Sequence, residues 1–153
     1  MEKVIVLGIG NRLMMDDGIG IYVVEALAEN HKDDQVQYLI GESDVDYCLE
    51  QIHGADTVII VDAVFNNKKA GEVSIIPLEE LREQQSLDIS PHNIHLFNAL
   101  YQQKDEVKGY LIAIEPSVIH FHIGLSKVLD GKWEQIKAEV EQKINLLKVE
   151  TEG

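Results

Sequence analysis

Short runs of apolar residues recur along the chain, and some of them are apolar at nearly every position. The two clearest are Lys3 to Leu7 and Thr57 to Val61, a pattern typical of strands buried on both faces of a sheet. Val36 to Ile40, Val73 to Pro77 and Gly109 to Ile114 predict three more strands. We therefore expect five strands.

The stretches between these runs have the apolar spacing of helices. Helical spacing extends from about Gly18 to Glu29 and from Pro91 to about Gln103, and a shorter stripe begins at Val45. The clearest helix lies near the C-terminus, where Ser126 is suited to cap its first turn. Its apolar stripe consists of Leu129, Trp133, Ile136, Val140, Ile144 and Leu147. We expect one long amphipathic helix there.

Strands that alternate with helices predict an α/β fold. We expect a three-layer sandwich in which a mostly parallel five-stranded sheet carries helices on both faces. The length of 153 residues suits one domain, here residues 1–150, followed by a short tail at 151–153. In such a sheet ligands bind beyond the carboxyl ends of the strands, so polar residues at those ends are the candidates for function.

Charge and cysteine content narrow the possible partners. The chain has 13 Lys and Arg against 27 Asp and Glu, a net charge of -14, which repels nucleic acid and anionic lipid. Cys48 is the only cysteine, so an internal disulfide is impossible and a cytoplasmic location is expected. Neither a signal peptide nor an apolar stretch of about 20 residues is present, so we expect no membrane association.

The segment after the first strand, Gly8 to Gly20, reads GIGNRLMMDDGIG. It is not a dinucleotide-binding fingerprint, because Leu13 stands where the third glycine would be. Two carboxylates, Asp16 and Asp17, then open a helix. They either complement the helix dipole as a cap or belong to a functional site.

Two further residues favour the functional interpretation. Asp62 follows a wholly apolar run, and a carboxylate in such a place needs a charged or hydrogen-bonding partner. In Ser90-Pro91-His92, the histidine falls in the first turn of a helix, which disfavours the imidazolium and leaves a neutral metal ligand. Asp17, Asp62 and His92 together would form an open metal site. It has no thiolate, so it suits a nickel ion that a partner already holds by cysteines.

Other candidates are weaker. His95 is three residues from His92, but a solvated or packed role is favoured for it. His120 and His122 have no neighbours that would complete a zinc site. Cys48 lies on the apolar stripe of its helix, which favours a core residue over a nucleophile.

Three blocks of sequence carry a likeness to a known family. They are VIVLGIGNRLMMDDGIG near the start, VIIVDAV from Val58 to Val64, and ISPHNI from Ile89 to Ile94. A fourth block, HIGLS from His122 to Ser126, leads into the last predicted helix. In order, spacing and length the chain resembles the hydrogenase maturation proteases over nearly its whole extent.

The resemblance implies an endopeptidase that removes the C-terminal peptide of a nickel-iron hydrogenase large-subunit precursor once nickel has been inserted. It implies that Asp17, Asp62 and His92 contact the metal, and that the precursor supplies the nickel as a recognition element. One hypothesis is that nickel polarises the scissile carbonyl or a bound water while Asp17 or Asp62 serves as the base. We expect a monomer that binds its precursor transiently.

The chain departs from the family's pattern after the second strand. Relatives often carry Gly-Gly-Thr or Gly-Gly-Ser there, whereas this chain has Gly41-Glu42-Ser43, the segment expected to bind the substrate's tail. Glu42 therefore places a side chain where these relatives have glycine, which has none. This departure keeps open a nickel-binding chaperone or sensor that cleaves nothing. A general doubly wound ligand-binding domain is a third hypothesis, and it predicts no response to nickel.

Overall fold

The computed structural model describes residues 2–30, 33–81, 91–103 and 107–152, with the side chains of residues 91–92 and 149–152 outside that description. Five strands form a single sheet in the order β2-β1-β3-β5-β4. Their bounds are β1 Val4–Ile9, β2 Val36–Glu42, β3 Thr57–Ala63, β4 Val73–Pro77 and β5 Lys108–Ile114. Four strands are parallel, and β4 pairs antiparallel with β5 at one edge.

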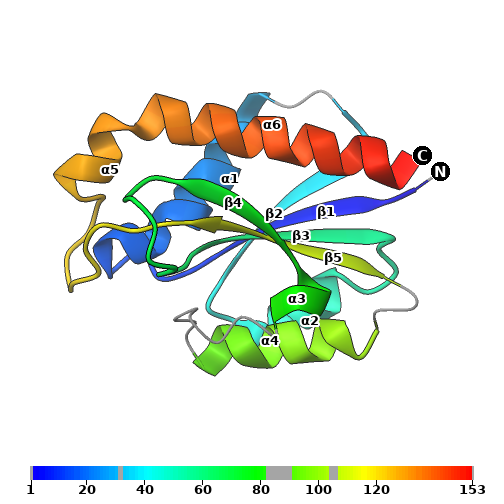
Figure 1. Cartoon of the computed structure of the whole chain (residues 1–153). Helices are drawn as coiled ribbons and strands as arrows, with labels where there is room; N and C mark the ends of the chain where they lie inside the picture. The colour runs from blue at the N-terminus through cyan, green and yellow to red at the C-terminus, as the bar shows by residue number, and fades with distance from the viewer. Residues whose placement is uncertain (1, 31–32, 82–90, 104–106, 153) are drawn as a thin grey trace.

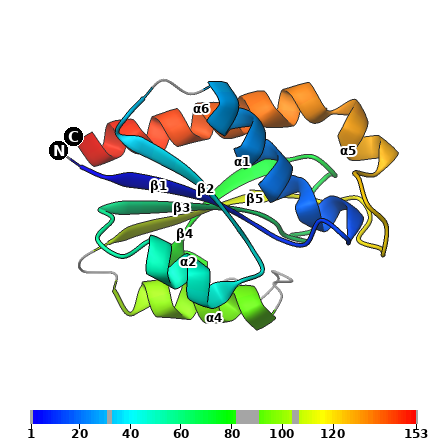
Figure 2. The same cartoon turned by 180° about the vertical axis from the view of Figure 1, so that it is seen from behind.

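The helices lie in two layers around this sheet (Figure 1). Their bounds are the 3-10 helix η1 Met15–Gly18, α1 Ile19–Asn30, α2 Val45–Gln51, α3 Leu78–Leu81, α4 Pro91–Tyr101, α5 Lys127–Gly131 and α6 Trp133–Glu152. Helices α1 and α6 cover one face, and α2 and α4 cover the other, as the reverse view in Figure 2 also shows. Two apolar cores result, one between each helical layer and the sheet. The predicted three-layer α/β sandwich is confirmed.

The central strand β3 explains why a carboxylate can be held in the interior. It pairs with β1 on one side and β5 on the other, and all seven of its residues are buried. An apolar run without alternation is therefore the pattern that this position requires. The strand extends two residues beyond the predicted run, so Asp62 lies within it and not after it.

The last predicted helix is divided into two. Ser126 caps α5, accepting a hydrogen bond from the Leu129 N–H, but that helix ends at Gly131. Lys132 then caps its end, and α6 begins at Trp133. Glycine favours a helix end, and Lys132 Nζ donates a 2.7 Å hydrogen bond to the Ala70 carbonyl in the loop before β4. The expectation of one continuous helix was wrong, although the apolar stripe does face the core.

No helix among the described residues is long and apolar enough to cross a bilayer. Helix α6 continues to Glu152, through most of the expected tail at 151–153. Ser90, the expected cap of α4, lies outside the described residues, whereas Pro91 is the first residue of that helix as predicted.

Candidate functional site

Asp62 is a buried carboxylate near the carboxyl end of β3, and only 1% of its surface is exposed. Its Oδ2 accepts a 2.6 Å hydrogen bond from Asn93 Nδ2 on α4. Its Oδ1 has no hydrogen-bond partner among the described residues. Burial raises the pKa of Asp62 well above its ordinary value, and the nearby charge of Asp17 raises it further, against hydrogen bonds from Ala63 and Asn93. A buried oxygen without a donor suits a proton or a cation.

Asp17 lies in η1, between β1 and α1, and is partly buried. Its Oδ2 accepts a 3.0 Å hydrogen bond from the Asn11 N–H. Burial raises the pKa of Asp17, and the Asn11 hydrogen bond opposes this rise. Because η1 and the start of α1 lie against β3, the structure brings together two of the three residues predicted as metal ligands.

Two glycines allow this approach. A Cβ atom on Gly20 would stand 2.3 Å from the Val61 carbonyl oxygen, so only glycine lets the start of α1 lie against the end of β3. A Cβ atom on Gly10 would stand 2.1 Å from the Asp17 carbonyl oxygen, and the φ of Gly10 is 139°. Glycine at both positions therefore holds the Asp17 backbone close to the strand that carries Asp62.

Asp16 has a different role from its neighbour. It is fully buried, and its two oxygens accept hydrogen bonds from the Ser117, Val118 and Ser126 N–H groups and the Ser126 hydroxyl, at 2.8 to 2.9 Å. These donors belong to the segment that joins β5 to α5. The N-cap of η1 is Met14, without a side-chain capping bond, so neither aspartate caps this helix. Asp16 ties a distant segment to the helix that carries Asp17.

His92 is the second residue of α4, and its side chain lies outside the described residues. The next residue, Asn93, donates to Asp62, so the backbone at His92 starts its helix close to the buried carboxylate. No three His, Cys, Asp or Glu side chains among those described gather into a metal-binding group. The contact of His92 with a metal therefore stays a prediction.

The segment Gly41-Glu42-Ser43 forms the exit from β2, beside the end of β1. The Gly10 N–H donates a 2.9 Å hydrogen bond to the Glu42 carbonyl, which places this turn at the same edge as η1. Gly41 is buried, and a Cβ atom there would stand 2.4 Å from the Cys48 sulfur, so its glycine serves packing. Glu42 and Ser43 are exposed, and a shallow hollow of about 360 Å³ adjoins them. Binding of the substrate's tail here stays a prediction.

Glu42 adopts the left-handed backbone conformation, with a φ of 51°. This is the conformation that glycine adopts without strain and other residues adopt at a cost. Arg12 compensates in part, because its Nε lies 3.3 Å from Glu42 Oε1 while its two terminal nitrogens bind Glu25. Glu42 therefore stands in a backbone conformation that glycine would adopt at lower cost.

We expect Glu42→Gly to unfold at higher denaturant concentration than Glu42→Ala. Both variants lose the exposed ion pair with Arg12, which is worth at most about 1 kcal/mol. Only glycine also relieves the left-handed strain, so the two should differ by about 1 kcal/mol. Urea denaturation followed by circular dichroism measures the difference. Equal stabilities would show that the backbone at this position carries no strain.

Two residues that matter here were missed by the sequence patterns. Asn93 was overlooked because an amide in a helical turn has no distinctive spacing. Glu115 follows β5 directly and is buried; one of its carboxylate oxygens accepts hydrogen bonds from the Asn66 and Lys68 N–H groups. The rule that selected Asp62 at the end of a strand would have found Glu115 as well.

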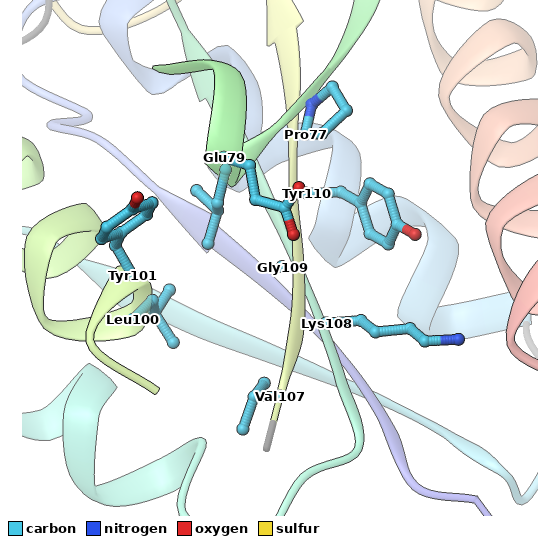
Figure 3. A pocket seen from close by; sticks show the side chains of 9 residues that line it. Pro77, Glu79, Leu100, Tyr101, Val107, Lys108, Gly109 and Tyr110 are labelled. Atoms are coloured by element: carbon cyan, nitrogen blue, oxygen red, sulfur yellow. The ribbon is translucent and has the colours of Figure 1, made fainter. Parts of the chain in front are cut away.

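Other features do not belong to this edge. A hollow of about 360 Å³ lies where β5 begins, lined by Val107, Lys108 and Tyr110 among others (Figure 3). Asp62 pairs with Ala113, near the opposite end of β5, so this hollow is far from the carboxylates. Cys48 is buried, and its burial raises the pKa of the thiol to about 11, which agrees with a core residue.

The arrangement offers a pair of acidic groups in unequal surroundings. Two carboxyl groups that lie close together and partly shielded from water do not both ionise readily, so one of them tends to keep a proton. Asp62 is the more deeply buried of the two and suits that state. The pair can therefore exchange a proton with a reacting group, or offer oxygen ligands to a cation.

The chain resembles one family of known proteins in both sequence and structure. Residues 21–143 match the family model described as HycI, hydrogenase maturation protease. The hydrogenase 2 maturation protease of Escherichia coli is 31% identical, over 90% of this chain and 88% of that protein. A putative hydrogenase maturation protease of Methanocaldococcus jannaschii is 30% identical, over 78% and 76%. The solved structure of the E. coli hydrogenase maturating endopeptidase HybD has a TM-score of 0.78 at 29% identity, covering 94% and 92% of the two chains.

Proposed function

Because this chain belongs to the hydrogenase maturation protease family, we propose that it removes the C-terminal peptide of a nickel-iron hydrogenase large-subunit precursor after nickel insertion. The observation that carries this proposal is the buried carboxylate of Asp62, which lies near Asp17. Its Oδ1 has no hydrogen-bond partner among the described residues. An interior carboxylate with an unsatisfied oxygen is costly, and such groups with a raised pKa are concentrated at functional sites.

The donor atoms suit nickel held by the precursor. Asp17 and Asp62 offer carboxylate oxygens, and His92 would add an imidazole nitrogen, which is a good ligand for this ion. A cation near the pair would lower the pKa of both carboxyl groups, and would so favour release of the proton that burial keeps on one of them. Nickel would therefore be part of the substrate. A precursor that lacks nickel would leave Asp17, Asp62 and His92 without the cation that they are expected to contact.

The two carboxylates take different parts in peptide hydrolysis. Nickel in the precursor would polarise the scissile carbonyl. Asp17 is the less buried carboxylate, and it acts as the base toward the attacking water. Asp62 holds a proton because of its burial and its neighbour, and it can deliver that proton to the leaving amine. Asn93 orients Asp62 through its 2.6 Å hydrogen bond.

A mass-spectrometric cleavage assay tests the proposal. The protein is mixed with the host's large-subunit precursor in nickel-loaded form and, as a control, with the same precursor lacking nickel. We expect a C-terminal peptide to be released only from the loaded precursor, and release to be lost in His92→Ala. An intact precursor that still forms a nickel-dependent complex would favour the chaperone hypothesis. Equal cleavage of both forms would refute recognition through nickel.

A further inference from the structure

Large apolar side chains are exposed beside the candidate site. Phe121 is 72% exposed, Ile123 71%, Leu13 47% and Val118 43%. Leu13 lies just before η1, and the other three lie in the segment that joins β5 to α5. We call these four residues the apolar rim. Exposed apolar residues gathered in one region of a soluble protein mark an interaction site more often than residues scattered singly do.

Backbone hydrogen bonds join the two segments of the rim. The His122 N–H donates to the Leu13 carbonyl and the Met15 N–H to the His122 carbonyl, each at 2.9 Å. In both Figure 1 and Figure 2, the connection from β5 to α5 lies beside the connection from β1 to α1. The four side chains therefore belong to one region of the surface.

The rim is held in place and is continuous with the site. Asp16 accepts hydrogen bonds from the Ser117 and Val118 N–H groups, and from the N–H and hydroxyl groups of Ser126. These bonds hold the segment that carries the exposed residues at both of its ends. Asp16 and Asp17 are adjacent in η1, so the same short helix holds the rim and carries the proposed base. A large partner that reaches Asp17 must lie over or beside these side chains.

Charge indicates which kind of partner fits. Residues 116–126 contain no Asp, Glu, Lys or Arg, although 26% of the whole chain is charged. A second copy of this chain would also carry a net charge of -14, and the two would repel each other. An uncharged apolar surface on a different protein avoids that repulsion. Interfaces of this kind have an apolar centre that is depleted of charged residues.

We propose that the apolar rim is the docking surface for the folded body of the precursor, which it binds through an apolar patch next to the scissile tail. This inference rests on the proposed function, because it takes the protein substrate as the occupant. The rim supplies binding energy away from the reacting bond, while Asp17 and Asp62 contact only the tail and the metal. Docking and chemistry are thereby separated on the surface, and they can be altered separately.

The test is the double substitution Phe121→Ser with Ile123→Ser, assayed on the nickel-loaded precursor. We expect KM to rise at least about tenfold with kcat changed less than about twofold, because truncated anchors weaken binding without touching the reacting atoms. The matched control is Leu146→Ser, a 55% exposed leucine on α6, which should leave KM unchanged. Thermal unfolding should be the same for all three proteins, since these side chains are exposed.

The outcomes separate the docking surface from the proposed activity. If wild type cleaves the precursor and the double variant has an unchanged KM, the docking surface is refuted and the activity stands. If wild type binds without cleaving, the activity fails, and a tenfold weaker Kd of the double variant still supports docking. An equal Kd refutes it, and so does an absence of binding by wild type. Self-association of wild type in sedimentation, lost in the double variant, would identify a second copy as the occupant and overturn the proposal.

Discussion

Asp62→Asn is expected to lower kcat on the nickel-loaded precursor by about 10²- to 10⁴-fold, the range typical of losing a general acid or base. Asparagine has nearly the same shape, and its side-chain oxygen can still accept the hydrogen bond from Asn93. It can neither ionise beside a cation nor pass on a proton. The loss should therefore arise from chemistry and not from a changed fold.

The same variant should be more stable than wild type at neutral pH, by about 1 kcal/mol or more, because the wild-type carboxyl is ionised in the unfolded chain and must take up a proton, or be buried as a charge, when the protein folds. The folded-state pKa of Asp62 is raised above its unfolded value. The contribution of this group to stability is therefore complete below the unfolded pKa and is lost as the pH rises through the folded pKa. The advantage of the variant should consequently shrink as the pH falls toward 4.

Urea denaturation at several pH values, together with the cleavage assay, checks both parts of this expectation. Asp46→Asn is a suitable control, since it removes an exposed carboxylate at the start of α2 and should alter neither kcat nor the pH dependence. Wild-type turnover by Asp62→Asn would exclude this carboxylate from the reaction. A stability difference that does not vary with pH would mean that Asp62 is not held with a raised pKa.

Asp16→Asn and Asp17→Asn are expected to have opposite consequences, although the two residues are adjacent. Asp16 is fully buried and accepts four hydrogen bonds, so its replacement should lower the free energy of unfolding by about 2–4 kcal/mol. An amide has only one acceptor oxygen and places two N–H groups against existing donors. Asp17 accepts one hydrogen bond from Asn11, so the same change there should cost less than about 1 kcal/mol.

Activity should follow the reverse order. Asp17→Asn should lose turnover by about 10²-fold or more because the proposed base is gone. Asp16→Asn should keep a measurable kcat at a temperature where the variant is folded, because its side chain faces the segment from Ser117 to Ser126 and not the tail. Denaturation curves and single-temperature kinetics on both variants decide the matter. Equal destabilisation by the two substitutions would contradict the division of roles.

Local patterns were sufficient for most of the fold. The apolar runs predicted all five strands because a strand buried on both faces allows few polar positions. Asp62 stood out for the same reason, as an ionisable residue at the end of the apolar run from Val58 to Val61. The division of the last helix at Gly131 was missed, since the apolar stripe continues with helical spacing from Leu129 to Trp133 across the break.

The sequence by itself determined the α/β architecture and indicated Asp17 and Asp62 as candidates, because apolar spacing and strand ends are properties of neighbouring residues. Only the tertiary structure revealed the structural role of Asp16, since the donors that satisfy its carboxylate are 101 to 110 positions away along the chain. It also revealed Asn93 as the partner of Asp62 and the strain at Glu42. Hydrogen-bond partners and backbone strain depend on how distant segments pack, and local spacing does not specify that packing.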